Sequence, residues 1–143
     1  MFGHPVNIDE IKKITKKKKI VIIEDAAESH GSKFKKEVVG SFGKISCFSF
    51  YVNKLITTGE GGLATTNNKT LAQKMFDLRS HGITKDVNRF KRKSPGPWAY
   101  EQQSLGFNYR MTDFQAALGI SQLKRLKKIV SERNKQYIIS VSY

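Results

Sequence analysis

The sequence has little cysteine and no long apolar run. Its 143 residues include one cysteine, Cys47, so the chain has no internal disulfide and we expect a reducing, cytoplasmic environment. The longest unbroken apolar run is four residues, Ile20–Ile23, whereas a membrane-spanning helix needs about 20. We therefore expect neither a transmembrane helix nor the apolar core of a signal peptide.

Acidic residues are also scarce, with 12 Asp and Glu against 26 Lys and Arg, which gives a net charge of +14. Such a surplus is typical of proteins that bind nucleic acid. Here the densest run, KKITKKKKI, lies on a predicted helix and its exit, and the other lysines are scattered. The sequence has no RGG tract, helix-turn-helix spacing or Cys/His finger. We interpret the charge as a solvated surface and keep a basic nucleic-acid-binding protein as the alternative.

The composition that is present indicates a folded protein. Hydrophobic residues make up 38% of the chain and charged residues 27%, which is typical of a globular domain. A chain of 143 residues is long enough to bury a core within one domain.

The first 25 residues predict a helix followed by a buried strand. Isoleucines recur at a spacing of three over residues 7–18, and two acids lie in the first turn, where the helix dipole favours them. The β-branched run Ile20–Ile23 predicts a strand buried on both faces, which ends in Glu24 and Asp25. A carboxylate at the end of a buried strand is typical of α/β sheets, where ligands gather at that edge.

The rest of the chain predicts further elements of the same kind. Residues 31–44 indicate a loop or hairpin around Lys33–Glu37. The predicted strands are Ile45–Phe50 and Leu63–Thr66, separated by tight turns at Gly59, Gly61 and Gly62. The predicted helices cover residues 69–80, capped by Asn67 or Asn68, and about 112–134, opened by the capping-box pair Thr112 and Gln115. Phe114, Ala117, Leu118 and Ser121 share a face of the last helix, and residues 82–104 predict an exposed excursion.

Three side chains stand at positions that suggest chemistry. Asp25 follows one predicted strand, Ser49 lies at the end of another, and Lys54 comes five residues later. Pyridoxal 5′-phosphate requires a lysine amine for a Schiff base, a carboxylate for its ring nitrogen and hydroxyls for its phosphate. The three residues supply these groups. Because Asp, Ser and Lys are common, the alternatives of a turn acid, a strand hydroxyl and a surface lysine remain open from this pattern.

Four blocks in order resemble the DegT/StrS family of sugar aminotransferases: EDAAESHGS, VGSFGKISCFSF, NKLITTGEGG and SLGFNYRMTDFQAALGISQLKRL. The resemblance extends from about Gly3 to about Asn134. It implies an α/β fold, namely part of the large domain of a fold-type I pyridoxal-phosphate enzyme, with a mostly parallel sheet flanked by helices. It places residues 1–143 in that partial domain, with residues 81–111 including the exposed excursion.

The resemblance also implies roles for individual residues. Lys54 would bind the cofactor covalently and act as general acid and base. Asp25 would bind the pyridinium nitrogen, and Ser49 the phosphate. Glu28 lies where the family often has Gln or His near the ring hydroxyl, a position in which a carboxylate needs protonation or a displaced pose. Asn108 would reach the phosphate of a partner subunit in a homodimer.

Arg110 and Tyr109 would shape the same site and contact the substrate. Within the family, GPWAYEQQSLGFNYRMTD resembles transaminases of UDP-linked 4-keto-6-deoxy hexosamines, and FSFYVNK is similar to perosamine synthases. The implied reaction transfers an amino group, from glutamate by family habit, to a nucleotide-linked keto sugar in surface polysaccharide or glycan synthesis. No metal is expected. We expect His30 and His81 to be structural, and Trp98 and Tyr100 to line either a sugar pocket or an anchored loop.

Members of the family are two to three times as long as this sequence, which matches their middle. The phosphate-binding half-domain that precedes this region and the small domain that follows it are absent from these residues. We therefore expect exposed apolar surface, poor folding alone and little transaminase activity. A noncatalytic remnant, or a complementing chain of a split enzyme, is the corresponding alternative.

Overall fold

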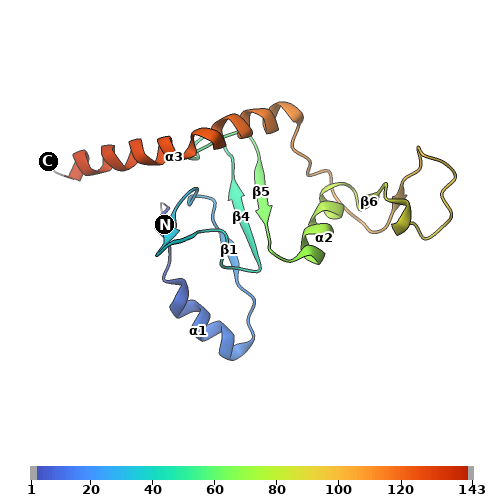
Figure 1. The fold of residues 1–143 in the computed structure, drawn as a ribbon, viewed down its shortest axis with the longest axis horizontal. Helices are drawn as coiled ribbons and strands as arrows, with labels where there is room; N and C mark the ends of the chain where they lie inside the picture. Colours follow the sequence, from blue (N-terminus) through green and yellow to red (C-terminus); the bar gives the residue numbers. More distant parts are fainter. Residues whose placement is uncertain (1–2, 142–143) are drawn as a thin grey trace. The chain divides into compact units, whose positions relative to one another are not determined.

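The structure is a computed structural model that describes residues 3–141, and its chain divides into two units (Figure 1). The first unit comprises residues 1–67 and 111–143, and the second comprises residues 68–110. The first contains α1 (Ile8–Lys18), β1 (Ile23–Asp25), β2 (Lys33–Phe34), β3 (Glu37–Val38), β4 (Ile45–Ser49), β5 (Gly62–Thr65) and α3 (Asp113–Val141). The second contains α2 (Lys69–Arg79), β6 (Ile83–Thr84), the 3₁₀ helix η1 (Val87–Arg89) and β7 (Glu101–Gln102).

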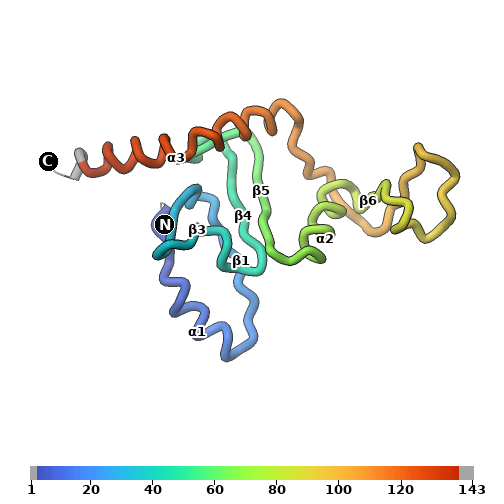
Figure 2. Tube along the Cα trace, in the orientation of Figure 1, coloured from blue at the N-terminus to red at the C-terminus, as the bar shows by residue number. Residues whose placement is uncertain are grey.

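The first unit is built on a three-stranded sheet in the order β1-β4-β5. β1 runs parallel to β4, with Asp25 opposite Cys47, and β5 runs antiparallel to β4, with Ser49 opposite Gly62. Figure 2 follows the chain from β1 through the β2–β3 hairpin and back into β4. The parallel pair brings the C-terminal ends of β1 and β4 to one edge of the sheet.

The predicted strand at Ile20–Ile23 is wrong in two respects. The strand starts only at Ile23 and continues through the two acids, and the isoleucines and valine are not buried, with Val21 63% and Ile23 66% exposed. β1 has one neighbour, β4, among the described residues. The β-branched run predicts a strand buried on both faces, whereas here it leads into an exposed strand at the edge of the sheet. The preceding helix is confirmed; it ends at Lys18 and is followed by Lys19 in a left-handed conformation.

The predicted loop or hairpin at 31–44 is confirmed. Lys33–Phe34 pairs with Glu37–Val38, and Lys35 takes the positive φ of 55° that the tight turn requires. Gly40 follows with a φ of +96°, and a Cβ there would collide with the Phe48 ring. A glycine is therefore needed for the hairpin to return to the sheet.

α3 begins as the capping box predicts. The Gln115 side chain accepts a hydrogen bond from the Thr112 N–H at 3.0 Å, and the Thr112 hydroxyl accepts one from the Gln115 N–H at 3.4 Å. The helix ends later than predicted, at Val141 instead of about residue 134. The face defined by residues 114, 117, 118 and 121 is exposed, with Phe114 91% exposed, and residues 116, 119 and 126 on another side of the helix line a cavity beside the sheet.

The core of the first unit is small. The buried hydrophobic residues of the described chain are Ile8, Ala26, Val39 and Ile56. A cavity of about 400 Å³ separates the sheet from α3, and its lining includes Phe48, Leu63, Ile120, Leu123 and His30. Leu63, Ile120 and Leu123 are 48–58% exposed, which agrees with the expectation of exposed apolar surface. No helix among the described residues is long and apolar enough to cross a membrane.

Residues 82–104, which were predicted to form an exposed excursion, contain more regular structure than their polar sequence suggested. Asn68 caps α2 by accepting a hydrogen bond from the Leu71 N–H at 2.9 Å, which settles the choice between Asn67 and Asn68. β6 pairs with β7, and an isolated bridge joins Ser80 to Asn108. The segment that follows α2 is therefore held by the short β6–β7 pair and by the bridge between Asn108 and Ser80, the residue directly after α2.

Candidate functional site

The parallel strands place Asp25 and Ser49 at one sheet edge. Asp25 closes β1 opposite Cys47, and Ser49 closes β4 two residues after Cys47. Side chains alternate between faces along a strand, so Asp25, Cys47 and Ser49 share one face. The sequence predicted Asp25 after one strand and Ser49 at the end of another, and in the structure the two residues are the last of two paired parallel strands.

The loop after β1 turns sharply. The Ala26 N–H donates to the Cys47 carbonyl at 2.8 Å, which extends the pairing of β1 with β4 by one residue. Oδ1 of Asp25 accepts a hydrogen bond from the Ala27 N–H at 3.1 Å. The Ser29 N–H then donates to the Ala26 carbonyl at 2.9 Å and closes a turn. This turn carries Glu28 outward beside the sheet edge.

Lys54 reaches the same loop from the other strand. A turn after β4, closed by the Lys54 N–H donating to the Tyr51 carbonyl at 3.0 Å, sets the lysine backbone. The ammonium group forms an ion pair with Oε1 of Glu28. The Lys54 side chain is 15% exposed and that of Glu28 is 53% exposed. The lysine singled out from the sequence thus has a largely covered side chain, and its amine pairs with Glu28 at the edge where β1 and β4 end.

The donor set at this edge fits pyridoxal phosphate. It combines a covered amine, a carboxylate and a hydroxyl on the ends of adjacent parallel strands, which are the groups that the cofactor requires. Asp25 is exposed and uses only Oδ1 in a hydrogen bond to the described residues, so Oδ2 is available to a ring N–H. Ser49 accepts a hydrogen bond from the Tyr51 N–H at 3.3 Å and retains its own proton for donation. The described residues contain no group of three or more metal-ligating side chains.

Glu24 is a residue whose role the sequence did not reveal. Its carboxylate accepts hydrogen bonds from the N–H groups of Gly40, Phe42 and Gly43 and from the Ser46 hydroxyl, at 2.6–2.8 Å. Burial by itself would raise the pKa of Glu24, but these four donors outweigh it and lower the pKa below its usual value of 4.5. Glu24 therefore holds the loop that leads into β4.

His30 lies beneath the site, in the lining of the cavity. It is 5% exposed, and its ring contacts Phe48 and Phe50 with centroids 5.5 and 5.7 Å away. Neither ring nitrogen has a hydrogen-bond partner among the described residues, although the Ser49 backbone approaches closely enough to oppose the effect of burial. Burial, the largest influence, lowers the pKa of His30 below 6.5. This placement agrees with a structural histidine.

The other predicted site residues lie in the second unit. Asn108 pairs with Ser80, and the Tyr109 N–H donates to the Arg79 carbonyl at 2.9 Å. The Tyr109 ring stacks on Phe107 with centroids 4.9 Å apart, and the side chains of Asn108, Tyr109 and Arg110 are exposed. Their roles in binding cofactor or substrate stay predictions.

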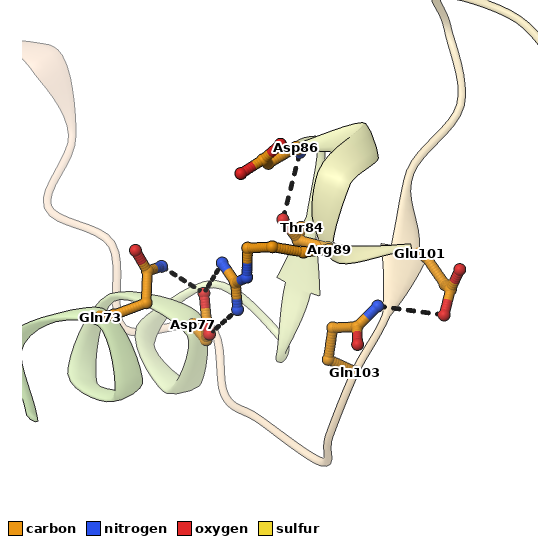
Figure 3. Close-up of polar contacts among 7 residues, drawn as sticks. All are labelled: Gln73, Asp77, Thr84, Asp86, Arg89, Glu101 and Gln103. Carbon is orange, nitrogen blue, oxygen red and sulfur yellow. Dashed lines mark hydrogen bonds and ion pairs between the residues drawn. The ribbon is translucent and has the colours of Figure 1, made fainter. Parts of the chain in front are cut away.

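A second polar cluster in that unit was not predicted. Figure 3 shows the Arg89 guanidinium directed at Asp77, with Gln73 on the other side of the carboxylate. Arg89 Nη1 donates to Oδ1 of Asp77 at 3.1 Å, Nη2 pairs with Oδ2, and the Gln73 amide donates at 2.9 Å. The Arg89 hydrogen bond lowers the pKa of Asp77. The Gln73–Asp77 spacing of four residues is visible in the sequence, but the contact with Arg89 is not.

Comparison with known proteins gives a consistent result. The model of the DegT/DnrJ/EryC1/StrS aminotransferase family matches residues 1–139. UDP-4-amino-4,6-dideoxy-N-acetyl-beta-L-altrosamine transaminase of Campylobacter jejuni is 44% identical over 131 residues, which are 92% of this chain and 32% of that protein. GDP-perosamine synthase of Caulobacter vibrioides is 40% identical over 135 residues, or 94% of this chain and 33% of that protein.

The fold is also similar to that of solved proteins. A structure of GDP-4-keto-6-deoxy-D-mannose-3-dehydratase from Escherichia coli, with bound hydrated pyridoxal phosphate, superposes with a TM-score of 0.81 at 32% identity. The match covers 94% of this chain and 36% of that one. The chain thus spans about a third of the length of the relatives it matches.

Proposed function

Because the chain belongs to the DegT/DnrJ/EryC1/StrS aminotransferase family, a family of pyridoxal-phosphate-dependent fold-type I transferases, we propose that it contributes the cofactor-binding part of a sugar transaminase. The substrate is a nucleotide-linked 4-keto-6-deoxy sugar, and glutamate is the amino donor. The reaction serves surface polysaccharide or glycan synthesis in the cytoplasm. The names of the relatives, a UDP-sugar transaminase and a GDP-sugar synthase, support this substrate class.

The observation that carries the proposal is the position of the covered Lys54 amine. It is held at the sheet edge where Asp25 and Ser49 end parallel strands. A lysine on the surface would extend into water, as Lys35 does with 72% of its side chain exposed. Placing an amine, a carboxylate and a hydroxyl at one edge is what cofactor binding requires, whereas stability of the sheet does not require it.

The roles follow from the chemistry of each group. Lys54 binds the cofactor through its amine and moves a proton at Nζ during transfer of the amino group. The Asp25 carboxylate accepts a hydrogen bond from the protonated ring nitrogen and keeps it charged. The Ser49 hydroxyl donates to the phosphate. When bound, pyridoxal phosphate withdraws electrons from the carbon that carries the amino group.

Three residues of the second unit complete the proposed site in a dimer. Asn108 contacts the cofactor phosphate of the partner subunit, and Arg110 and Tyr109 bind substrate. The support for these roles is the similarity of the GFNYR segment to the family. The exposure of all three side chains leaves them available for such contacts.

The test is covalent capture of the cofactor. The purified chain is mixed with pyridoxal phosphate, reduced with borohydride and digested, and the peptides are analysed by mass spectrometry. We expect the added mass on the Lys54 peptide and not on that of Lys44, which precedes β4. Lys54→Arg retains the charge and should abolish the adduct. Equal labelling of many lysines would contradict the proposal, because it would indicate nonspecific condensation with surface amines.

A second candidate is a complementing chain of a split enzyme. The observation that favours it is the exposed apolar surface of the first unit, in which Leu63, Ile120 and Leu123 are 48–58% exposed, in a chain that spans a third of its relatives. The chain is mixed with a polypeptide made from the part of the Campylobacter transaminase that precedes the matched region. Complementation predicts a stable complex on a sizing column and amino transfer that neither polypeptide shows alone. Two separate peaks would count against it.

A further inference from the structure

The Lys54–Glu28 ion pair differs from the other lysine ion pairs of the described chain. Lys35 pairs with Asp9 and Lys128 with Glu132, and both lysines are more than 70% exposed. Lys54 is 15% exposed and is held by a carboxylate that lies 26 residues earlier in the sequence. A surface pair exchanges freely with water and contributes little, whereas a covered cation depends on its partner for solvation.

The two partners differ in their freedom to move. Glu28 is 53% exposed, so its carboxylate can rotate into water at little cost. Lys54 has less freedom, because its side chain is only 15% exposed. The turn closed by Ser29 and Ala26 fixes the backbone of Glu28, while its side chain remains near solvent. Glu28 is therefore the partner that can release the pair.

While Oε1 of Glu28 holds the Lys54 ammonium group, Nζ cannot attack an aldehyde, because an ammonium group has no lone pair. Release requires that the half-exposed Glu28 carboxylate turns toward water and that Nζ gives up a proton to the solvent. The N–H bond then breaks, water takes the proton, and the neutral amine has the lone pair that attacks the carbonyl carbon.

We propose that Glu28 is a positioning residue that holds the Lys54 ammonium group at the sheet edge and restrains its reaction with an aldehyde until the ion pair opens. This role rests on the proposed function and deepens it. It also resolves the difficulty of a carboxylate at a position beside the phenolic oxygen of the cofactor. The acid faces the lysine instead.

The experiment measures the reactivity of Lys54 in the cofactor-free chain. The probe is formaldehyde with cyanoborohydride at fixed pH, and methylation of each lysine is followed by peptide mass spectrometry. Glu28→Gln removes the charge with little change of size. We expect the rate at Lys54 to rise about two- to fivefold, the worth of a partly exposed ion pair, with no change at Lys35 or Lys128. An unchanged rate at Lys54 overturns the proposal.

Two further variants separate position from charge. Glu28→Asp keeps the negative charge but withdraws it by one methylene, so we expect a rate close to that of Glu28→Gln. A wild-type rate in Glu28→Asp would show that only the local field matters and would overturn the positioning role. Asp9→Asn is the matched control on the surface pair, and should leave Lys54 unchanged. Circular dichroism of each variant checks that the chain keeps its helices.

Uptake of pyridoxal phosphate distinguishes this inference from the proposed function. If both hold, Glu28→Gln takes up the cofactor faster than the wild type, in step with its faster methylation. If both chains take it up at the same rate, Glu28 has no role in binding of the cofactor by Lys54. The inference then fails, while the proposed function stands. If neither chain takes it up, the proposed function fails, and the loading role of Glu28 fails with it.

Discussion

Glu24 and Asp25 are adjacent in the sequence but act on opposite faces of β1. Glu24 lies opposite Ser46 and accepts a hydrogen bond from its hydroxyl at 2.7 Å. It also accepts hydrogen bonds from three backbone N–H groups of the loop before β4. Asp25 lies opposite Cys47, on the face that also carries Ser49. The alternation of a strand thus divides two neighbouring carboxylates between support of a loop and the proposed binding of a cofactor.

Exchanging each acid for its amide should separate these two roles. Glu24→Gln replaces a charged acceptor of four hydrogen bonds, so we expect faster hydrogen exchange at Gly40, Phe42 and Gly43. We also expect the free energy of unfolding to fall by about 1–2 kcal/mol. Asp25→Asn should leave that exchange unchanged and weaken capture of pyridoxal phosphate. The control Glu37→Gln changes an exposed acid of the hairpin and should affect neither measurement. Similar effects from both variants would contradict the division.

The hydrogen bonds of Glu24 also predict an acid-sensitive loop. Its pKa is lower in the folded chain than its usual value of 4.5, so the unfolded chain binds the proton first as the pH falls. The stabilisation is fully present above pH 4.5 and is lost as the pH falls through the folded pKa. Amide exchange in residues 40–43, followed from pH 6 downward and corrected for intrinsic rates, should accelerate below about pH 4.5. Glu24→Gln should abolish that acceleration.

His30 predicts a second pH dependence at a higher pH. Burial keeps the folded ring neutral, with Lys54 acting in the same direction and Glu28 opposing it. Since its pKa is lowered, the unfolded chain gains a proton below about pH 6.5 and the folded chain does not, so stability falls as the pH drops below that value. Urea unfolding at pH 7.5 and 5.5 measures the difference.

Replacing that ring tests the cause. His30→Phe fills the same space without buried polar atoms that lack partners, so we expect a gain of about 1 kcal/mol at pH 7.5 and a flatter pH profile. His4→Gln alters an exposed histidine and should retain the wild-type profile. A loss of stability in His30→Phe would mean that a water or other partner satisfies the imidazole in solution.

The contact of Arg89 with Asp77 predicts which substitution loosens the second unit. Arg89→Ala leaves a largely buried carboxylate without its bidentate partner, so we expect faster proteolysis within residues 82–104. Arg92→Ala removes an exposed positive charge from the same segment and is the matched control. Equal protease sensitivity of the two variants would show that the ion pair does not hold the segment.

The sequence predicted best the elements that neighbouring residues mark clearly, such as helices with a capping residue. The cap at Asn67 or Asn68 and the capping box of Thr112 and Gln115 placed two helix starts to within a residue, and a polar residue was expected at the end of each of two strands. Burial of Ile20–Ile23 was predicted wrongly, because β-branched residues indicate a strand but not how many neighbours it has. The end of α3 was predicted too early. No glycine or proline follows residue 134 to stop the helix, and it continues to Val141.

The contacts between distant residues could not be predicted. Lys54 and Glu28, Arg89 and Asp77, and Glu24 and the loop at 40–43 are joined by the path of the backbone, which a short window of residues does not reveal. The resemblance to a family placed Glu28 near the cofactor. Only the structure shows that its partner in this chain is the lysine.

The position of Cys47 has a practical consequence. The sequence contains no other thiol, and this one is exposed, lies opposite Asp25 and precedes Ser49 by two residues on the same face. A maleimide dye or spin label would therefore attach at a single place, beside the groups proposed to hold the cofactor. Its fluorescence or mobility would report in real time on anything that enters or leaves that edge of the sheet.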